Sequence, residues 1–179
     1  MFYLFLADGF EETEALAPLD MMRRAKIEVK TVGVTGEFVT GSHGVTVKAD
    51  LKPEEISFNN IDGVVLPGGM PGTVNLGKSE TVTKAAVYCA ENGKITAAIC
   101  AAPSVLGNLG ILKGKKATCF PGFEKELEGA TYTAAPVEID GNVITGKGAG
   151  CAILFSKAIV EKAVSAEAAN KVCGDMQCP

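Results

Sequence analysis

The stretch Ile95-Thr-Ala-Ala-Ile-Cys-Ala-Ala-Pro103 decides the fold, because a strand in it passes into a helix without a spacer. Ile95–Ile99 is a short apolar run, and the helix is expected to extend to about Leu109. The alanines around Cys100 leave room for a tight turn between them. A strand that leads directly into a helix is a unit of α/β folds with a mostly parallel sheet.

The same alternation continues toward both ends of the chain. Buried or β-branched runs predict strands at Phe2–Leu6, Ile27–Val34, Gly63–Leu66 and Lys116–Cys119, with hairpins at Gly36–Ala49 and Val137–Thr145. Apolar residues at helical spacing predict helices at Glu11–Ala25, Glu80–Asn92, Cys151–Val164 and Ala166–Met176. We therefore predict an α/β fold with helices on both faces of the sheet, formed by one domain over residues 1–179.

Composition excludes several classes of protein. The 179 residues are 47% apolar and 21% charged, as in an ordinary globular protein, and the net charge of −4 is not that of a nucleic-acid binder. No apolar run approaches the roughly 18 residues that span a bilayer. The N-terminus lacks the basic region and cleavage site of a signal peptide. We expect a cytoplasmic protein that binds neither membrane nor nucleic acid.

The chain contains one histidine and six cysteines. His43 alone cannot build a zinc site of two or three imidazoles, so no metal is expected. A Ser-His-Asp or Cys-His site would need His43 or a histidine from another chain. We expect His43 to be an exposed turn residue. No C-x-x-C pair occurs, and the closest spacing is Cys173 to Cys178. Reduced thiols fit this chain better than disulfides.

Ligands of open α/β sheets bind beyond the carboxyl ends of the strands, where Cys100 lies. A strand-to-helix elbow exposes a nucleophile and often strains its backbone. We also expect the helix N-terminus to lower the pKa of the Cys100 thiol. The alternative is a buried, inert cysteine.

Glu14 follows the first strand and lies inside the next helix. Its carboxyl could point across the top of the sheet toward Cys100, remain protonated and act as a general acid or base. The alternative is compensation of the helix dipole, which accounts for Glu11 and Glu12.

Two further loops lie near the same edge. Gly68 and Gly69 offer backbone N–H groups that could form an oxyanion site, or they belong to an ordinary loop. Neither a P-loop nor a dinucleotide fingerprint is present, so no cofactor is expected.

Cys119 is a possible second thiol near this crevice. Three other cysteines, Cys89, Cys151 and Cys173, are expected to pack in the core.

Three segments together resemble the ThiJ/PfpI superfamily, in the branch that contains the parkinsonism-associated protein deglycase and its bacterial relatives. They are FLADGFEETEALAPLDMMRRA (5–25), DGVVLPGGMPG (62–72) and AAICAAPSVLGNLGIL (97–112). Residues 117–127 and 144–163 fit later segments of the same family. The resemblance implies a flavodoxin-like three-layer sandwich and a homodimer.

For the site, the resemblance implies an oxidisable Cys100 nucleophile beside a protonated Glu14. By the same match, the amides of Gly69 and Ala101 form an oxyanion hole with Gly68 beside them. The family's activities include glutathione-independent glyoxalase, deglycation and redox-regulated chaperoning. Its protease branch has a histidine where this chain has Ala101, which argues against a peptidase.

Two departures from the family pattern matter. Phe120 stands where a histidine is frequent in this family. The preceding Cys119 is a second thiol, which the resemblance places where it could form a disulfide with Cys100. His43 stands where an arginine is common in related dimers, so a contact with an anion across the interface would depend on pH.

The leading hypothesis is a cofactor-independent cysteine enzyme that acts on small α-oxoaldehydes or their early adducts through Cys100 and Glu14. The alternative is an oxidative-stress redox sensor or chaperone that uses the same thiol with little catalysis. A third possibility, a flavodoxin-like binding module, requires Cys100 to be unreactive.

Overall fold

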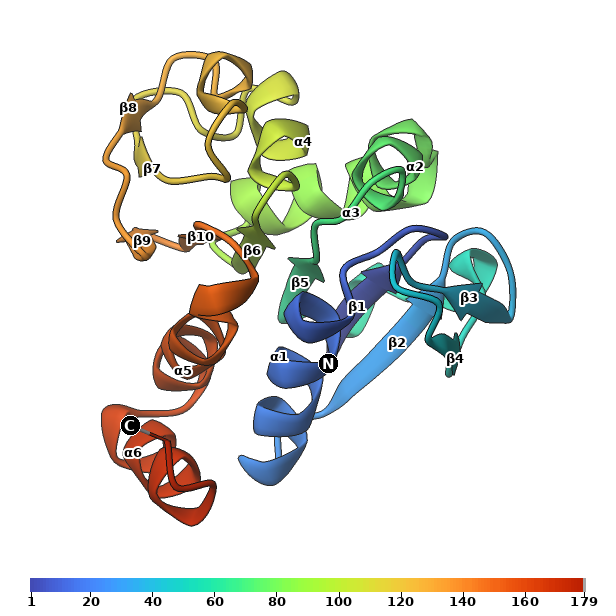
Figure 1. Cartoon of the computed structure of the whole chain (residues 1–179), viewed down its shortest axis with the longest axis vertical. Coiled ribbons are helices and arrows are strands. Elements are labelled where there is room, and N and C mark those ends of the chain that lie inside the picture. The colour runs from blue at the N-terminus through green and yellow to red at the C-terminus, as the bar shows by residue number, and fades with distance from the viewer. Residues whose placement is uncertain (179) are drawn as a thin grey trace.

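A six-stranded sheet forms the centre of the computed structural model, which describes residues 1–178 (Figure 1). Its strand order is β2-β1-β5-β6-β10-β9. The strands are β1 (Phe2–Leu6), β2 (Val29–Gly33), β5 (Gly63–Leu66), β6 (Ile95–Ile99), β9 (Val137–Asp140) and β10 (Val143–Gly146). All neighbours pair in parallel except β9 and β10, which form the predicted hairpin at one edge.

Helices cover both faces of this sheet, as the alternating pattern predicts. One core cluster joins the sheet to α1 (Glu12–Arg24), α5 (Ala152–Ala163) and α6 (Ala166–Asp175). The other joins it to α2 (Gly72–Lys78), α3 (Glu80–Glu91) and α4 (Pro103–Asn108). Because β1, β5 and β6 contribute alternate residues to the two clusters, all their residues are buried. The predicted three-layer, flavodoxin-like sandwich is confirmed.

Smaller elements differ from the predictions in detail. The predicted strand at Lys116–Cys119 is reduced to β7 (Lys116–Ala117), which pairs with β8 (Thr131–Tyr132) outside the main sheet. The first predicted hairpin is confirmed as β3 (Phe38–Thr40) and β4 (Thr46–Lys48). Four single-turn 3₁₀ segments, at Pro53–Glu55, Phe58–Asn60, Glu124–Glu126 and Ala149–Cys151, complete the described elements.

The parallel strands place their carboxyl ends along one edge of the sheet. The segment before α1 follows β1 there, the Pro67–Gly72 loop follows β5, and Cys100 follows β6. The three loops that the sequence singles out therefore meet at this edge. Within residues 1–178, every helix is too short or too polar to cross a bilayer.

Candidate active site at the β6–α4 elbow

Cys100 occupies a strained turn between β6 and α4. Its φ of 66° lies in the left-handed region, which residues with a side chain rarely adopt. The backbone N–H of Cys100 donates to the Gly146 carbonyl at 2.9 Å, and its carbonyl accepts from the Phe120 N–H at 2.8 Å. These bonds fix the turn between β10 and the loop after β7. The half-buried thiol lies at the predicted elbow.

Glu14 reaches this thiol from the first turn of α1. The Glu11 carboxylate caps the helix by accepting the Glu14 N–H at 2.7 Å, which orients this turn. The Glu14 side chain is fully buried, and its Oε2 accepts the Gly68 N–H at 2.9 Å. Oε1 is also buried and makes no hydrogen bond of normal geometry. The carboxyl is therefore anchored through Oε2 at Gly68, and Oε1 is left without a hydrogen-bond partner.

The carboxyl and the thiol titrate as a coupled pair. Burial raises the pKa of Glu14 to about 7, against the opposing effect of its hydrogen bonds with Cys100 and Gly68. Burial, and then the charge and hydrogen bond of Glu14, raise the pKa of Cys100 to about 12. Since ionising one group disfavours ionising the other, the pair keeps one proton over a wide pH range above neutrality.

The direction of the Cys100 shift corrects one prediction. We expected the helix N-terminus to lower the pKa of the thiol, but burial and Glu14 raise it. Helix α4 has only six residues and begins three positions after Cys100. Its dipole therefore lowers the pKa of the thiol by less than burial raises it. The thiolate therefore depends on Glu14 retaining the shared proton.

Backbone amides favour the negative charge on sulfur. The N–H groups of Ala101 and Gly69 hydrogen-bond to the Cys100 side chain and act to lower its pKa. Gly69 has a φ of 90°, which turns its amide within the loop after β5. The structure thus brings together all five predicted site residues: Cys100, Glu14, Gly68, Gly69 and Ala101. Their chemical roles remain predictions.

Gly68 lies between the Glu14 carboxyl and the Cys100 side chain, and there is no room for a side chain at this position. A Cβ at this position would lie 2.7 Å from Cys100 Cβ and 2.7 Å from Glu14 Oε2. We expect Gly68→Ala to lower the free energy of unfolding by about 1–3 kcal/mol, the usual cost of overpacking. Gly150→Ala is the matched control, because its Cβ would meet open space. Urea denaturation measures both, and equal stabilities would show that the loop yields to the methyl group.

Cys119 lies near the elbow but belongs to different surroundings. The backbone N–H of its neighbour Phe120 donates a hydrogen bond to the Cys100 carbonyl, yet Cys119 itself packs in the core cluster of α2, α3 and α4. Cys100 packs against the cluster on the other face of the sheet. Both thiols are free. The disulfide between Cys100 and Cys119 that the resemblance suggests is therefore not formed in this structure.

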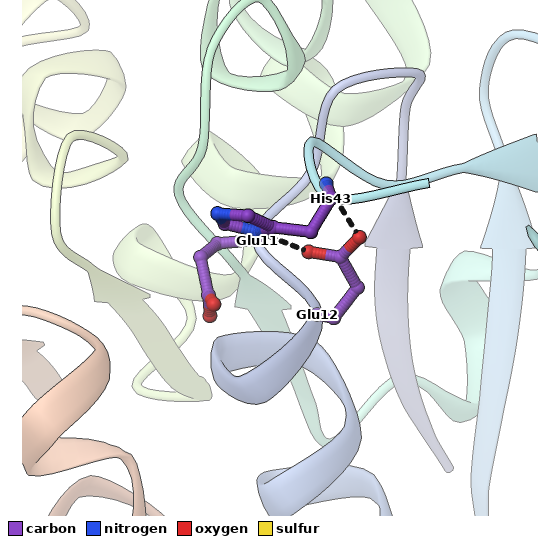
Figure 2. A group of neighbouring side chains, drawn as sticks. All are labelled: Glu11, Glu12 and His43. Atoms are coloured by element: carbon purple, nitrogen blue, oxygen red, sulfur yellow. Dashed lines mark hydrogen bonds and ion pairs between the residues drawn. The ribbon is translucent and has the colours of Figure 1, made fainter. Parts of the chain in front are cut away.

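Glu12 and His43 form a contact that sequence reasoning missed (Figure 2). Glu12 Oε1 accepts the His43 backbone N–H at 2.7 Å, and Oε2 lies 2.9 Å from His43 Nδ1. The imidazole is 72% exposed, as expected of a turn residue, whereas the carboxylate is only 11% exposed. Glu12 is thus more than a charge at a helix end. It ties the β3–β4 hairpin to the start of α1.

These two residues and Glu11 place three potential metal ligands within 4.8 Å of one another. Distance alone would allow a cation to bind. However, the Glu12 oxygens already accept hydrogen bonds from the hairpin backbone and face the imidazole. We therefore interpret the group as an ion pair that holds the hairpin.

The ion pair shifts both pKa values in the directions expected of partners. Burial raises the pKa of Glu12, but hydrogen bonds from the His43 side chain and from the backbone outweigh it and lower the pKa to about 2. The hydrogen bond with Glu12, and then its charge, raise the pKa of His43. The pair is therefore complete at mildly acidic pH and loses its charge on histidine as pH rises through that raised pKa.

Because His43 is the only histidine, its titration can be followed by the imidazole signals in proton NMR. We expect a pKa above the ordinary value of about 6.5 in the native protein. Glu12→Gln should lower it, since the charged partner is gone, whereas Asp20→Asn on the exposed side of α1 should leave it unchanged. Identical titration curves for the native protein and Glu12→Gln would contradict the ion pair.

A cavity of about 360 Å³ lies between α2, α4 and the loop after β7. Its walls include Met70, Thr73, Ser104, Val105 and Phe123. Cys100 does not line this cavity, although Met70 follows Gly69 in the chain. We assign the cavity no part in the chemistry of the thiol.

Known proteins share this fold and sequence. The family model described as the DJ-1/PfpI family matches residues 2–162. The chain is 36% identical over 174 residues to Protein DJ-1 homolog B of Arabidopsis thaliana, covering 96% of this chain but only 40% of that protein. A deglycase from Pyrococcus abyssi is 33% identical over 144 residues, covering 79% of this chain and 86% of that protein.

A solved structure of oxidised DJ-1 from Toxoplasma gondii superposes with a TM-score of 0.94 at 32% identity, covering 98% of this chain and 97% of that chain. The fold, the matched family model and these relatives agree over most of the sequence. This chain therefore belongs to the DJ-1/PfpI family.

Proposed function

We propose that the protein is a cofactor-independent cysteine enzyme that acts on α-oxoaldehydes, such as methylglyoxal, or on their early adducts. One observation carries the proposal: the fully buried Glu14 carboxyl hydrogen-bonds to a thiol whose sulfur accepts two backbone N–H groups. A carboxyl that keeps a proton near neutral pH beside a nucleophile is suited to general acid–base catalysis.

In the first step, Cys100 passes its proton to the Glu14 carboxylate, and the resulting thiolate attacks the aldehyde carbon, so that the C=O bond becomes a C–O⁻ bond. The N–H groups of Gly69 and Ala101, which bond to the sulfur in the free protein, lie where they can stabilise the developing oxyanion. The Glu14 carboxyl then gives its proton to this oxygen. The products of the step are a hemithioacetal and a Glu14 carboxylate.

In the second step, the Glu14 carboxylate removes the proton from the former aldehyde carbon. An enediol forms, and return of the proton to the neighbouring carbon gives the thioester of lactate. The Gly68 N–H holds Oε2 of this carboxylate in place during the transfer. Water then hydrolyses the thioester, which releases lactate and regenerates the thiol. Methylglyoxal and one water molecule together become lactate, with no net oxidation.

The relatives support this reaction class only broadly. The archaeal protein of similar length carries the name deglycase, and deglycation also begins at carbonyl adducts. The Arabidopsis relative is more than twice as long as this chain, so its activities and partners do not transfer directly. Ala101 in place of the histidine of the protease branch leaves peptidase activity outside the proposal.

The direct test is turnover of methylglyoxal by the purified protein without glutathione. We expect substrate loss matched by lactate formation, in a ratio of one to one. Disappearance of methylglyoxal without lactate would indicate simple thiol or amine adducts and would contradict the reaction. Heat-unfolded protein at the same concentration is the control, because it keeps the amines and thiols but loses the site.

A second candidate function, a redox sensor or chaperone, is favoured by the same two amides. A sulfinate at Cys100 would accept their N–H groups as readily as a thiolate. Titration with peroxide followed by peptide mass analysis distinguishes the candidates. Selective oxidation of Cys100 with negligible lactate formation supports the sensor. Uniform oxidation of the six thiols contradicts it.

We also propose a cytoplasmic homodimer. All six cysteines are free, which suits a reducing compartment. Exposed apolar side chains on three separate segments, Val45, Phe120 and Leu154, would be protected by a second subunit. Light scattering after size-exclusion chromatography is expected to give twice the mass of the chain, and a monomer at micromolar concentration would contradict the dimer.

A further inference from the structure

The chain reverses direction at the C-terminal end of α6 through a specific hydrogen-bonding pattern. The Cys178 N–H donates to the Cys173 carbonyl at 2.9 Å, and the Gln177 N–H donates to the Gly174 carbonyl at 3.1 Å. Gln177, between these donors, has a left-handed φ of 56°. This combination is the Schellman motif, which brings the side chains of its first and last residues together.

Other helices of this chain end in the same way. After α1, the Ile27 N–H donates to the Met22 carbonyl and Lys26 has a φ of 61°. After α4, the Ile111 N–H donates to the Leu106 carbonyl. In both cases the two outer residues are apolar and pack in the same core cluster. At the end of α6, both of these positions are cysteines.

The two thiols are in contact. The Cys178 thiol hydrogen-bonds to that of Cys173, and both cysteines are free and half-buried. Burial, followed by the neighbouring Cys178, raises the pKa of Cys173, while Lys157 acts in the opposite direction. A helix terminus that holds two thiols together needs little movement to join them, and partial exposure admits a small oxidant.

We propose that Cys173 and Cys178 form a reversible disulfide when the protein meets hydrogen peroxide. The thiolate of one cysteine attacks the O–O bond, giving a sulfenic acid and water. The other thiol then attacks this sulfur, forms the S–S bond and releases a second water. Two thiols and one peroxide become one disulfide and two waters, and a dithiol reductant reverses the reaction.

This site is separate from the β6–α4 elbow. In Figure 1, α6 lies at the opposite end of the molecule from α4. The Schellman hydrogen bonds use no atom of the loops around Cys100. The proposal therefore does not depend on the proposed enzyme function, and the disulfide should form equally well in a Cys100→Ser background.

Mass analysis of the full-length Cys100→Ser protein provides the test. Trypsin cleaves after Lys171, so Cys173 and Cys178 fall in one peptide that begins at Val172. After brief peroxide treatment and blocking of free thiols, we expect this peptide to lose two mass units and to resist the blocking reagent. A dithiol reductant should restore both thiols. Cys178→Ser should abolish the loss of two units, whereas Cys151→Ser, which removes a half-buried thiol elsewhere, should preserve it.

Two results would overturn the proposal. One is oxygen addition at Cys173 or Cys178 in the native pair without any loss of two mass units. The other is persistence of that loss in the Cys178→Ser protein, which would place the bond elsewhere. Circular dichroism of each variant establishes that α6 and the rest of the chain remain folded during the measurement.

Discussion

Cys100→Ser is expected to reduce the rate of lactate formation from methylglyoxal by about a thousandfold or more. A serine hydroxyl at this turn keeps the backbone geometry but cannot ionise by giving its proton to Glu14 near neutral pH. The two amides that stabilise the sulfur would then face a neutral hydroxyl. Initial rates at saturating methylglyoxal, measured as lactate produced, give the size of the loss.

Two measurements make this result specific to Cys100. Cys119→Ala removes the nearby thiol, which packs in the cluster on the other face of the sheet, and should leave most of the activity. Thermal unfolding of both variants checks that neither has lost its fold. Comparable losses in the two proteins would show that the reaction needs both sulfurs, and unchanged turnover in Cys100→Ser would exclude Cys100 as the nucleophile.

The inner strands β1, β5 and β6 could be predicted from sequence because they are buried on both faces and therefore lack exposed polar positions. The helix α2 could not. Its sequence, Gly-Thr-Val-Asn-Leu-Gly-Lys, contains two glycines and several poor helix formers. Gly72 at its start packs so closely against the backbone of Gly9 and Phe10 that a Cβ would lie 2.7–2.9 Å from them. Tertiary packing, which local propensity does not report, supports this helix.

The same distinction applies to the site. The pairing of Cys100 with Glu14 follows from topology, because parallel strands deliver both residues to one edge of the sheet. The pairing of Glu12 with His43 spans 31 residues and depends on how the β3–β4 hairpin folds over α1. Gly41 permits this approach, since a Cβ there would lie 2.4 Å from the Glu12 carboxylate. The raised pKa of the thiol also depends on burial, which no spacing rule reveals.

Glu14→Gln is expected to lower the turnover rate by roughly 10²–10⁴-fold, the usual range for loss of a general acid–base. Glutamine preserves the size of the side chain and can accept the Gly68 N–H. It cannot give a proton to the oxyanion or remove one from carbon. The effect should therefore fall on kcat more than on KM. Glu28→Gln, an exposed substitution after α1, is the matched control and should retain full activity.

The same substitution should make the protein more stable above neutral pH. The pKa of Glu14 rises from its ordinary value of 4.5 to about 7 on folding, so between these two pH values the native state holds a proton that the unfolded chain has lost. The contribution of this group to the free energy of unfolding is therefore most favourable below pH 4.5. It falls by as much as about 3 kcal/mol as the pH rises from 4.5 through 7. Glutamine has no such penalty.

The difference in unfolding free energy between Glu14→Gln and the native protein isolates this contribution, because titrating groups distant from Glu14 cancel to first order and the Cys100 thiol, whose pKa is about 12 in the native protein, keeps its proton below pH 8. We expect the difference to increase from pH 4.5 to 8 in favour of the variant, measured by urea denaturation at each pH. A flat difference would mean that Glu14 ionises without cost and would remove the physical basis for its role as an acid. Greater stability combined with lost turnover would instead show that the native chain keeps an unfavourable buried carboxyl for its chemistry.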